Sequence, residues 1–362
     1  MKVLEINTSS FSRLGITVHL LNYYSHIDAQ DVQSDFIANG KVDESIVKEF
    51  ENLGFRVYKM ENRNRNVISY AIALYKIMKQ EKYDIVRVHG SSAKMSIEMI
   101  VAQLAHVKVK IIHSHSTMTT RPIVHKVLRP LMCILANTYF ACGEAAGKFL
   151  FGKQPFDIIP NGIDTDAYSF DERTRKKIRA ELGFEGRIVV GHVGNIVPVK
   201  NHPFMLKIMS ELVKINSEYL LVCVGWGDTS VLDELCMELQ IEDNVIFLGK
   251  RDNVNEIIQG FDVMILPSFN EGLPIVAVEG QASGLPFIIS DTVTRDVAFS
   301  DDIKYLNIDN NEIEWAQEID RLVCDIKRNR ADGSKIVKMS GYDIRDDAKK
   351  LVNKFKSLVK NY

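Results

Sequence analysis

Two glutamates, Glu271 and Glu279, flank a stretch of the chain that has the features of a helix start. Pro274 lies between them and suits the first helical position, where the N–H that proline lacks would be unpaired anyway. Free backbone N–H groups at the positive end of a helix dipole bind anions such as phosphate. The stretch therefore predicts an anion site formed by the N–H groups of Gly272, Leu273 and Ile275.

The two carboxylates next to this anion site need neutral partners, because a second anion would be repelled. Sugar and ribose hydroxyls are such partners, and one ionised carboxylate can accept hydrogen bonds from two of them. Glu279 follows Pro274 by five residues, about 7 Å at the helical rise, which is the reach from a diphosphate to its ribose. The pattern indicates a nucleotide diphosphate sugar, with the ribose at Glu279 and the transferred sugar at Glu271.

Three stretches of the chain resemble glycosyltransferase family 4, which contains retaining enzymes of the GT-B fold. Glu271-Gly-Leu-Pro, with Glu279 eight positions on, resembles the E-x7-E motif of the family. Residues 159–164 resemble its interdomain segment, and residues 191–202 resemble its phosphate loop. The resemblance is strongest to bacterial enzymes that assemble capsular, exo- or lipopolysaccharide. It implies an α/β chain of two Rossmann-like, doubly wound domains facing a central cleft, with a C-terminal helix that crosses back to the N-terminal domain.

The elements expected along the chain fit that organisation, since short apolar runs alternate with helical patterns as in parallel sheets flanked by helices. We expect an acceptor-binding domain over residues 1–165, a nucleotide-sugar-binding domain over 166–341 and the returning helix over 342–362. The expected strands are 3–7, 55–59, 85–89, 110–115 and 138–142 in the first half, and 188–193, 219–224, 245–248, 263–266 and 287–290 in the second.

Length, composition and charge narrow the class of protein further. The 362 residues suggest two domains, and no apolar run reaches the roughly 18 residues that a membrane span needs. The N-terminus reads as a buried strand, and the five scattered cysteines lack disulfide or metal spacing, so a cytoplasmic protein with reduced thiols is expected. Residues 1–180 carry 25 Lys and Arg against 18 Asp and Glu, whereas the remainder carries 20 against 29.

The basic first half suits an anionic partner, either a lipid-linked diphosphate acceptor or the membrane surface itself; a solvated basic face without a partner is the alternative. No nucleic-acid motif accompanies the charge. Peripheral membrane contact is expected from basic positions interleaved with Phe55, Tyr58 and Ile123, namely Arg56, Lys59, Arg63, Arg65, Arg121, Lys126 and Arg129.

Lys200 occupies the position at which the resemblance places a cation against the donor diphosphate, where it would stabilise the charge that develops on the leaving group. A solvated surface lysine is the alternative. The family usually has an arginine five residues earlier, but this chain has Asn195. A neutral amide can donate a hydrogen bond but supplies neither charge nor a bidentate fork. This departure from the family pattern leaves the strength of diphosphate binding and the choice of donor open.

The resemblance also implies a histidine at the end of an N-domain strand, facing the reacting sugar. His113 and His115 both qualify, because alternation along a strand sends them to one face. We favour His115, which is nearer the strand end; a core or capping histidine is the alternative. Gly15, between the first strand and the first helix, would allow close approach of a phosphate or the acceptor, or would serve as a plain turn residue.

Lys250 and Arg251 are expected to flank the nucleotide base, because they follow a strand where the family holds it; both could equally be solvated. Asp164-Thr-Asp166 spells a D-x-D motif, but its position favours turn formation and helix capping over a metal site. No other group of His, Asp and Glu has the spacing of metal ligands. Neither a metal nor another cofactor is therefore expected.

These observations together predict a retaining glycosyltransferase that moves a hexose or N-acetylhexosamine from a nucleotide diphosphate sugar, with UDP the expected nucleotide, to a lipid-linked glycan of bacterial surface polysaccharide. His115, Lys200 and Glu271 are the predicted catalytic residues. A non-catalytic, nucleotide-sugar-binding subunit is one alternative, to which Asn195 gives weight. A nucleotide-sugar epimerase of the same fold is another, for which no further acid–base carboxylates are evident.

Overall fold

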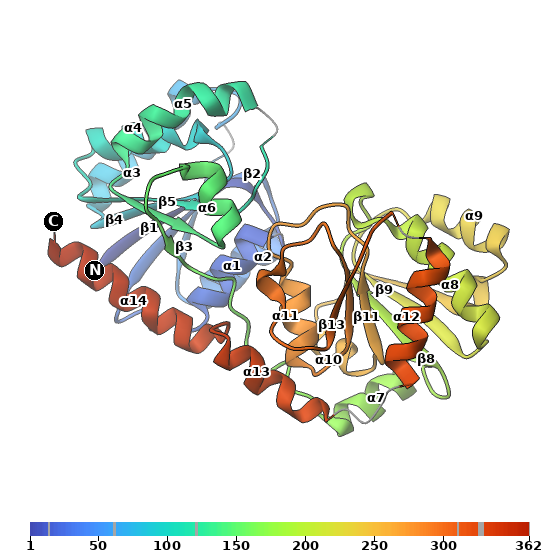
Figure 1. Ribbon diagram of the computed structural model, residues 1–362. Coiled ribbons are helices and arrows are strands. Elements are labelled where there is room, and N and C mark those ends of the chain that lie inside the picture. The colour runs from blue at the N-terminus through green and yellow to red at the C-terminus, as the bar shows by residue number, and fades with distance from the viewer. Residues whose placement is uncertain (14, 61–62, 120–121, 310, 325–328, 362) are drawn as a thin grey trace. The chain divides into compact units, whose positions relative to one another are not determined.

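A computed structural model describes residues 1–13, 15–60, 63–119, 122–309, 311–324 and 329–361. The chain divides into two compact units: unit 1 consists of Met1–Gly162 with Asp343–Tyr362, and unit 2 of Ile163–Tyr342. Each unit contains one parallel β-sheet flanked by helices, as Figure 1 shows. The expected α/β class with two Rossmann-like units is confirmed.

The sheet of unit 1 has the strand order β3-β2-β1-β4-β5-β6-β7, with all pairs parallel. Its strands are β1 (Lys2–Phe11), β2 (Gln33–Val42), β3 (Arg56–Met60), β4 (Ile85–Gly90), β5 (Val109–Ser114), β6 (Thr138–Ala141) and β7 (Asp157–Ile158). Its helices are α1 (Gly15–Tyr24), α2 (Glu44–Asn52), α3 (Val67–Glu81), α4 (Ser96–Leu104), α5 (Pro122–Leu135), α6 (Glu144–Phe151) and α14 (Ile344–Asn361).

Alternate side chains of the central strands in unit 1 enter two separate cores, one on each face of the sheet. Val3 belongs to the core under α1, α2 and α14, whereas its neighbour Leu4 belongs to the core under α3, α4 and α5. The C-terminal helix α14 contributes Leu351 and Phe355 to the first of these cores and lies beside α1 (Figure 1). Its apolar positions at helical spacing explain this packing.

The sheet of unit 2 has the order β10-β9-β8-β11-β12-β13, again with parallel pairs. Its strands are β8 (Ile188–Val193), β9 (Tyr219–Val224), β10 (Val245–Gly249), β11 (Val263–Leu266), β12 (Phe287–Ser290) and β13 (Ile303–Leu306). Its helices are α7 (Glu172–Leu182), α8 (His202–Ile215), α9 (Ser230–Leu239), α10 (Val254–Gln259), α11 (Ile275–Ala282), α12 (Glu312–Cys324) and α13 (Gly333–Met339).

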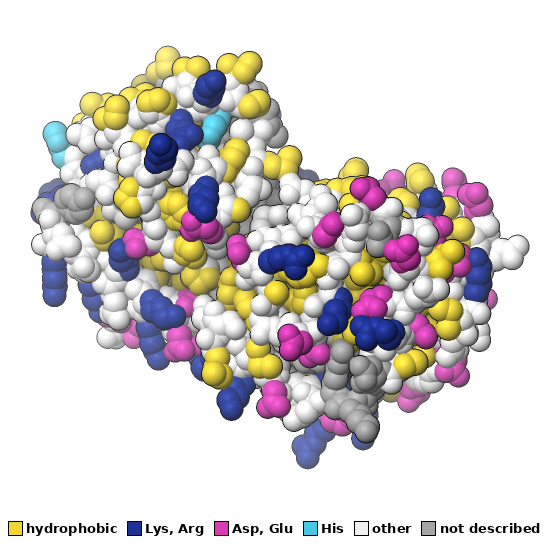
Figure 2. Space-filling view, in the orientation of Figure 1, with side chains coloured by type: hydrophobic (Ala, Val, Ile, Leu, Met, Phe, Trp, Pro, Cys, Tyr) yellow, Lys and Arg dark blue, Asp and Glu magenta, His cyan; other side chains and the backbone are white. Residues whose placement is uncertain are grey.

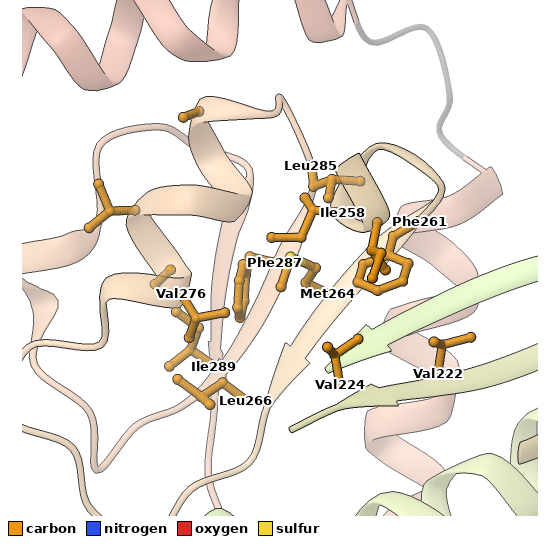
Figure 3. Close-up of a cluster of buried hydrophobic side chains, with 14 of the residues drawn as sticks. Val222, Val224, Ile258, Phe261, Met264, Leu266, Val276, Leu285, Phe287 and Ile289 are labelled. Atoms are coloured by element: carbon orange, nitrogen blue, oxygen red, sulfur yellow. The ribbon is translucent and has the colours of Figure 1, made fainter. Parts of the chain in front are cut away.

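Helix α11 packs directly against the sheet of unit 2. Val276 on its inner face joins Met264, Leu266, Phe287 and Ile289 in the buried core that Figure 3 shows. A Cβ atom at Gly280 would lie 2.8 Å from the sulfur of Met264 and 2.9 Å from the ring of Phe287. Glycine at this position therefore permits the close packing that fixes where the N-terminus of α11 lies.

The strands expected for the second half match β8, β9, β11 and β12 residue by residue, whereas β2, β7 and β13 were not predicted. Strand β5 ends at Ser114, so His115 lies just beyond the strand rather than within it. Within the described part of the chain, no helix combines the length and apolar character that crossing a membrane requires.

Candidate active site

The loops that follow β8, β9 and β10 in unit 2 are joined by backbone hydrogen bonds. The N–H of Gly194 donates to Val224 O at 2.8 Å, and the N–H of Gly225 donates to Gly249 O at 3.0 Å. A Cβ atom on Gly225 would lie only 2.0 Å from Gly194 O. The glycines of the Gly225-Trp-Gly-Asp segment are thus needed for this close approach, and they give the phosphate-loop region a fixed backbone.

Asn195 contributes to the same junction, because its Oδ1 accepts a hydrogen bond from the N–H of Trp226 at 3.1 Å. The side chain of Asn195 is half-buried. Its oxygen is therefore engaged in positioning the loop after β9, and only its NH₂ group is left to offer a ligand. An arginine at this position could not accept that hydrogen bond.

Lys200 ends the short 3-10 helix Pro198–Lys200, and its Nζ lies 2.6 Å from Oε1 of Glu271. The two side chains are 17% and 15% exposed, so the ion pair is partly shielded from water. The N–H of Phe269 donates to Val199 O at 2.9 Å and joins the two loops that carry the pair. The structure thus brings together the two catalytic residues that the sequence predicts for unit 2.

The start of α11 differs from the expectation by one residue. Pro274 has φ −71° and ψ 105°, an extended conformation, so it precedes the helix and Ile275 is the first helical residue. The N–H of Ala277 donates to Pro274 O at 3.0 Å. The N–H groups at the first two helical positions, Ile275 and Val276, have no intrahelical acceptor, and such groups at a helix N-terminus can bind an anion.

Gly272 and Leu273 lie in the loop before α11, not within its first turn. Their N–H groups are therefore not part of the helix N-terminus, and contact of these groups with the donor stays a prediction.

Glu279 lies in α11, and its Oε1 accepts a hydrogen bond from the hydroxyl of Tyr168 at 2.8 Å. Burial raises the pKa of Glu279 to about 7, which the hydrogen bond from Tyr168 only partly offsets. Sequence reasoning treated this carboxylate as ionised, and it missed Tyr168. Tyr168 follows the turn at Asp164 and belongs to no motif that would mark it in the sequence.

The remaining predicted positions have simpler surroundings. Lys250 and Arg251 are exposed directly after β10, next to Gly249. Gly15 is the first residue of α1, and a Cβ atom there would meet nothing within 4 Å, so no contact requires glycine at that position. Oδ1 of Asp164 accepts from the N–H groups of Asp166 and Ala167, both at 3.1 Å, which confirms the turn expected at the D-x-D sequence.

Unit 1 brings four histidine rings together at the carboxyl ends of its central strands. Strand pairing places His89 on β4 directly beside His113 on β5. His115 follows on the same side, with its ring centre 4.1 Å from that of His113, and His19 on α1 approaches the rings of His113 and His115 to 5.1 and 4.9 Å. One ring nitrogen from each of the four lies within 4.8 Å of the others. The sequence prediction of no metal-ligand cluster did not anticipate this group.

The environment of this histidine cluster keeps its members neutral at pH 7. Burial, followed by the nearby Arg87 charge, lowers the pKa of His89 to about 4. Burial and then the neighbouring histidines lower the pKa values of His113 and His115 well below the ordinary value. His113 is fully buried and His115 half-buried, so His115 is the more accessible of the two candidates. Which of them faces a donor sugar stays a prediction.

A buried carboxylate supports the histidine cluster from β1. Oε2 of Glu5 lies 2.7 Å from Nε2 of His89, and Nη2 of Arg87 lies 2.8 Å from Oε1. Burial alone would raise the pKa of Glu5, but the Arg87 charge and the hydrogen bond from His89 lower it to about 2. Glu5 is therefore an ionised acceptor that orients His89.

A polar pocket of about 830 Å³ opens in unit 1 beside the strand ends that carry His89 and His115. Its walls come from the end of β1, the start of α1 and the segments after β3, β4 and β5, and half of the lining side chains are serine or threonine. Sequence reasoning missed this pocket because serine and threonine in loops carry no distinctive signal. The lining includes Thr8, Ser9, Asn64, Ser91, Ser92, Lys94, Ser116 and Thr119.

The basic residues proposed for membrane contact have mixed surroundings. Arg63 is 6% exposed and pairs with buried Glu98 at 2.7 Å, so it is not available to a lipid surface. Arg56 and Lys59 pair with carboxylates of their own unit, Glu81 and Glu44. Arg65 and Lys126 are exposed and Arg129 is half-buried, while Arg121 lies outside the described residues.

Comparison with known proteins agrees with the geometry of both units. Residues 14–167 match the family model "Glycosyltransferase Family 4", and residues 174–335 match the model "Glycosyl transferases group 1". The "Putative glycosyltransferase EpsF" of Bacillus subtilis is 30% identical over 361 residues, covering 95% of this chain and 94% of the relative. The Escherichia coli UDP-Gal:alpha-D-GlcNAc-diphosphoundecaprenol alpha-1,3-galactosyltransferase is 27% identical over 67% of each chain.

Solved structures show the same fold at low sequence identity. HepE of Anabaena, solved in complex with UDP, has a TM-score of 0.81 at 16% identity and covers 99% of this chain and 100% of its own. WaaG, a glycosyltransferase involved in lipopolysaccharide biosynthesis, has a TM-score of 0.72 at 13% identity, with 97% and 99% covered. The full-length relative and the two family models establish that the chain is a glycosyltransferase of family 4 with the GT-B fold.

Proposed function

We propose that this glycosyltransferase moves a hexose or N-acetylhexosamine from a UDP-sugar to a lipid-linked glycan of bacterial surface polysaccharide, with retention of anomeric configuration. The observation that carries the proposal is the ion pair between two residues of unit 2. Lys200 comes from the phosphate-loop region, and Glu271 comes from the loop that leads into α11. A cation and a helix N-terminus suit a diphosphate, and a carboxylate next to them suits the hydroxyls of the sugar that the diphosphate carries. The UDP complex of HepE and the lipid-diphosphate acceptor in the name of the E. coli relative support the choice of substrates.

Catalysis in this proposal consists of positioning and electrostatic stabilisation. Lys200 and the N–H groups of Ile275 and Val276 stabilise the departing diphosphate, and Glu271 orients the donor sugar. The neutral imidazole of His115 offers the sugar a hydrogen bond without adding charge. The leaving phosphate accepts the proton of the acceptor hydroxyl on the same face of the sugar, which gives retention. The diphosphate is neutralised by these groups, so we propose that transfer needs no divalent metal ion.

The polar pocket of unit 1 is the proposed acceptor site. Its hydroxyl and amide side chains can donate to and accept from glycan hydroxyls, and Lys94 supplies a positive charge for a diphosphate. Counted over the sequence, unit 1 carries 26 Lys and Arg against 17 Asp and Glu, whereas unit 2 carries 19 against 30. The anionic acceptor therefore suits unit 1.

A panel of UDP-, GDP-, ADP- and dTDP-sugars, tested by thermal shift and calorimetry with a chelator present, examines the donor. We expect one UDP-sugar to bind and stabilise the chain without metal, and Glu279→Ala to weaken that binding by about tenfold or more because it removes the acceptor for the ribose hydroxyls. Binding that needs a divalent ion, or a preference for another nucleotide, would contradict the assignment of the donor. If no nucleotide-sugar bound, the chain would be better explained as a non-catalytic subunit.

The raised pKa of Glu279 predicts how UDP binding depends on pH. Only the ionised carboxylate can accept from both ribose hydroxyls, and with a pKa of about 7 the ionised fraction rises from about 0.1 at pH 6 to about 0.9 at pH 8. We therefore expect UDP affinity, measured by calorimetry, to rise about tenfold over this range. In Glu279→Gln the rise should disappear, apart from the titration of the UDP phosphate that both proteins share. His192 and His202 cannot cause it, since their pKa values are about 3 and about 4.

Helix α5 presents an apolar stripe to solvent, and we propose that it docks unit 1 on anionic lipid at the cytoplasmic face of the membrane. Ile123, Val127 and Ile134 are 79%, 70% and 79% exposed at helical spacing, while Met132 on the opposite side is buried. Figure 2 shows hydrophobic and basic side chains intermingled where Figure 1 places α5. A shallow pocket of about 480 Å³ beside the helix is lined by Lys126, Arg129 and Lys153, which suits lipid phosphate.

Flotation with phosphatidylglycerol-containing vesicles tests this surface. We expect the double variant Ile123→Glu/Ile134→Glu to bind at least about tenfold more weakly, because it removes apolar insertion and adds two charges of the same sign as the lipid. Ile68→Glu on α3, at a position 74% exposed, is the matched control and should bind as the wild type does. Equal binding of the double variant and the wild type would exclude α5 as the docking element.

A further inference from the structure

We propose that the histidine cluster of unit 1, formed by His19, His89, His113 and His115, binds one transition-metal ion through four imidazole nitrogens. This inference goes beyond glycosyl transfer and does not depend on it. The four residues come from α1, β4, β5 and the residue after β5, and one ring nitrogen from each already lies within 4.8 Å of the others. All four ligands belong to unit 1, and His115, which is one of them, would make the hydrogen bond proposed above to the donor sugar through its other ring nitrogen.

The arrangement is close to tetrahedral coordination without satisfying it yet. With Zn–N bonds of about 2.0–2.1 Å, the four nitrogens of a tetrahedral site lie about 3.3–3.4 Å apart. Nδ1 of His89 and Nε2 of His115 are 2.9 Å apart and share a hydrogen bond, which a bound metal ion would replace. The other separations are all within 4.8 Å, so ring movements of about 1 Å would complete the set. Rotations about χ1 and χ2 of the histidines can supply such movements without moving the strands.

Two of the four rings are oriented by partners in the way that metal ligands are. Nδ1 of His19 lies 2.9 Å from Oδ1 of Asn161, which can only accept, so Nδ1 carries the proton and Nε2 has a free lone pair. Nε2 of His89 faces ionised Glu5 in the same manner, which leaves Nδ1 of His89 with its lone pair. A carboxylate or carbonyl oxygen behind the imidazole fixes the tautomer and raises the basicity of metal-binding histidines.

Buried nitrogens without partners provide an independent reason to expect a ligand. His113 is 0% exposed, and neither of its ring nitrogens has a hydrogen-bond partner among the described residues; the same holds for Nε2 of His19. Burying polar atoms without partners is costly, and such groups in proteins usually mark a bound ion or water. A metal ion would bind a lone pair of each of these two rings at once.

The donor set determines which metal ions suit the site. Four neutral imidazoles and no carboxylate within the set favour zinc, copper, nickel or cobalt, whereas Mg²⁺ and Ca²⁺ prefer oxygen ligands. The metal proposed here is therefore distinct in chemistry from the Mg²⁺ or Mn²⁺ that would accompany a nucleotide diphosphate, and it agrees with metal-independent binding of the donor.

Metal content and cobalt spectroscopy test the proposal on the full chain, with any affinity tag removed because a histidine tag would itself bind metal. After treatment with a chelator and dialysis, the chain is titrated with Co²⁺ and then with Zn²⁺. We expect one equivalent of Co²⁺ to give the intense visible absorption of tetrahedral coordination, and Zn²⁺ to displace it. His113→Asn should lose the band and bind Zn²⁺ at least about 100-fold more weakly, because it removes a ligand from the centre of the set.

The matched control is His106→Asn, at an exposed position with φ 60°, which asparagine tolerates. It should bind as the wild type does. His115→Gln, at the half-buried position, provides a second ligand variant if His113→Asn fails to fold, and circular dichroism establishes whether each variant is folded. The proposal is overturned if the wild type binds no stoichiometric Co²⁺ or Zn²⁺, or if folded His113→Asn or His115→Gln binds either ion as tightly as the wild type.

Discussion

Replacing Glu271 with alanine should lower the rate of glycosyl transfer by more than about 10³-fold, to a small residual rate, while the chain stays folded. Among the described residues the carboxylate pairs with Lys200 at 2.6 Å, and it lies in a loop rather than in the core. Removing it leaves α11 and its N-terminal N–H groups in place, so UDP should still bind. What is lost is the group that holds the donor sugar against the reacting face.

Product formation from the donor identified in the nucleotide-sugar panel, with circular dichroism and thermal unfolding as checks of the fold, measures this effect. Glu234→Ala on α9, an exposed glutamate outside the site, is the matched control and should be fully active. Glu271→Gln retains a hydrogen-bonding oxygen and should keep more activity than the alanine variant. If Glu271→Ala turned over at a rate near that of the wild type, the donor sugar would have to be held elsewhere.

The parts of the fold that sequence predicted well are those in which neighbouring residues determine the structure. Strands β9 and β11 are continuous apolar runs buried on both faces, and β8 and β12 are apolar except for His192 and Ser290, so all four can be recognised from the local sequence. Strand β2 is also fully buried along its centre, but it contains Asp35 and Asn39. Asp35 accepts from Tyr83, and Asn39 donates to Asn7 O, partners that are 48 and 32 residues away. No local pattern indicates that these polar side chains are satisfied inside the fold.

The candidate site likewise has some features that the local sequence predicts and others that depend on contacts between distant residues. The phosphate loop and the E-x7-E segment are contiguous motifs, so Lys200 and Glu271 could be singled out from the sequence, whereas the ion pair between them is seen only in the structure. The second role of Asn195, the partner of Glu279 and the pKa of Glu279 depend on contacts across 31 and 111 residues and on burial. These are properties of the packed chain, so spacing in the sequence could not supply them.

Part of the histidine cluster could nevertheless have been predicted from the sequence. His89 ends one predicted strand, and His113 and His115 lie at the end of the next, 110–115. Adjacent parallel strands bring their carboxyl ends together, so these three of the four rings could have been placed side by side. His19 could not, because it depends on which face of the sheet α1 covers. A search for metal ligands by sequence spacing alone therefore misses sites assembled across parallel strands.

Replacing Lys200 with methionine should lower kcat by about 10²–10³-fold, with a smaller effect on donor binding. Methionine keeps an unbranched stem that can pack on Gly194, where the Lys200 side chain lies within 3.2 Å of the Cβ position. The lost charge matters most when negative charge develops on the departing diphosphate, so the loss should appear in kcat rather than in KM. Lys207→Met on the exposed side of α8 is the matched control and should be unaffected.

The double variant Lys200→Met/Glu271→Ala distinguishes a catalytic lysine from one that only holds Glu271. Lys200→Met alone leaves a half-buried carboxylate without its cation, so part of its loss reflects the disturbed Glu271. The combined loss should therefore be smaller than the product of the two single losses, yet larger than that of Glu271→Ala alone. If the double variant were no worse than Glu271→Ala, Lys200 would act only through Glu271, and stabilisation of the diphosphate would fall to the N–H groups of α11.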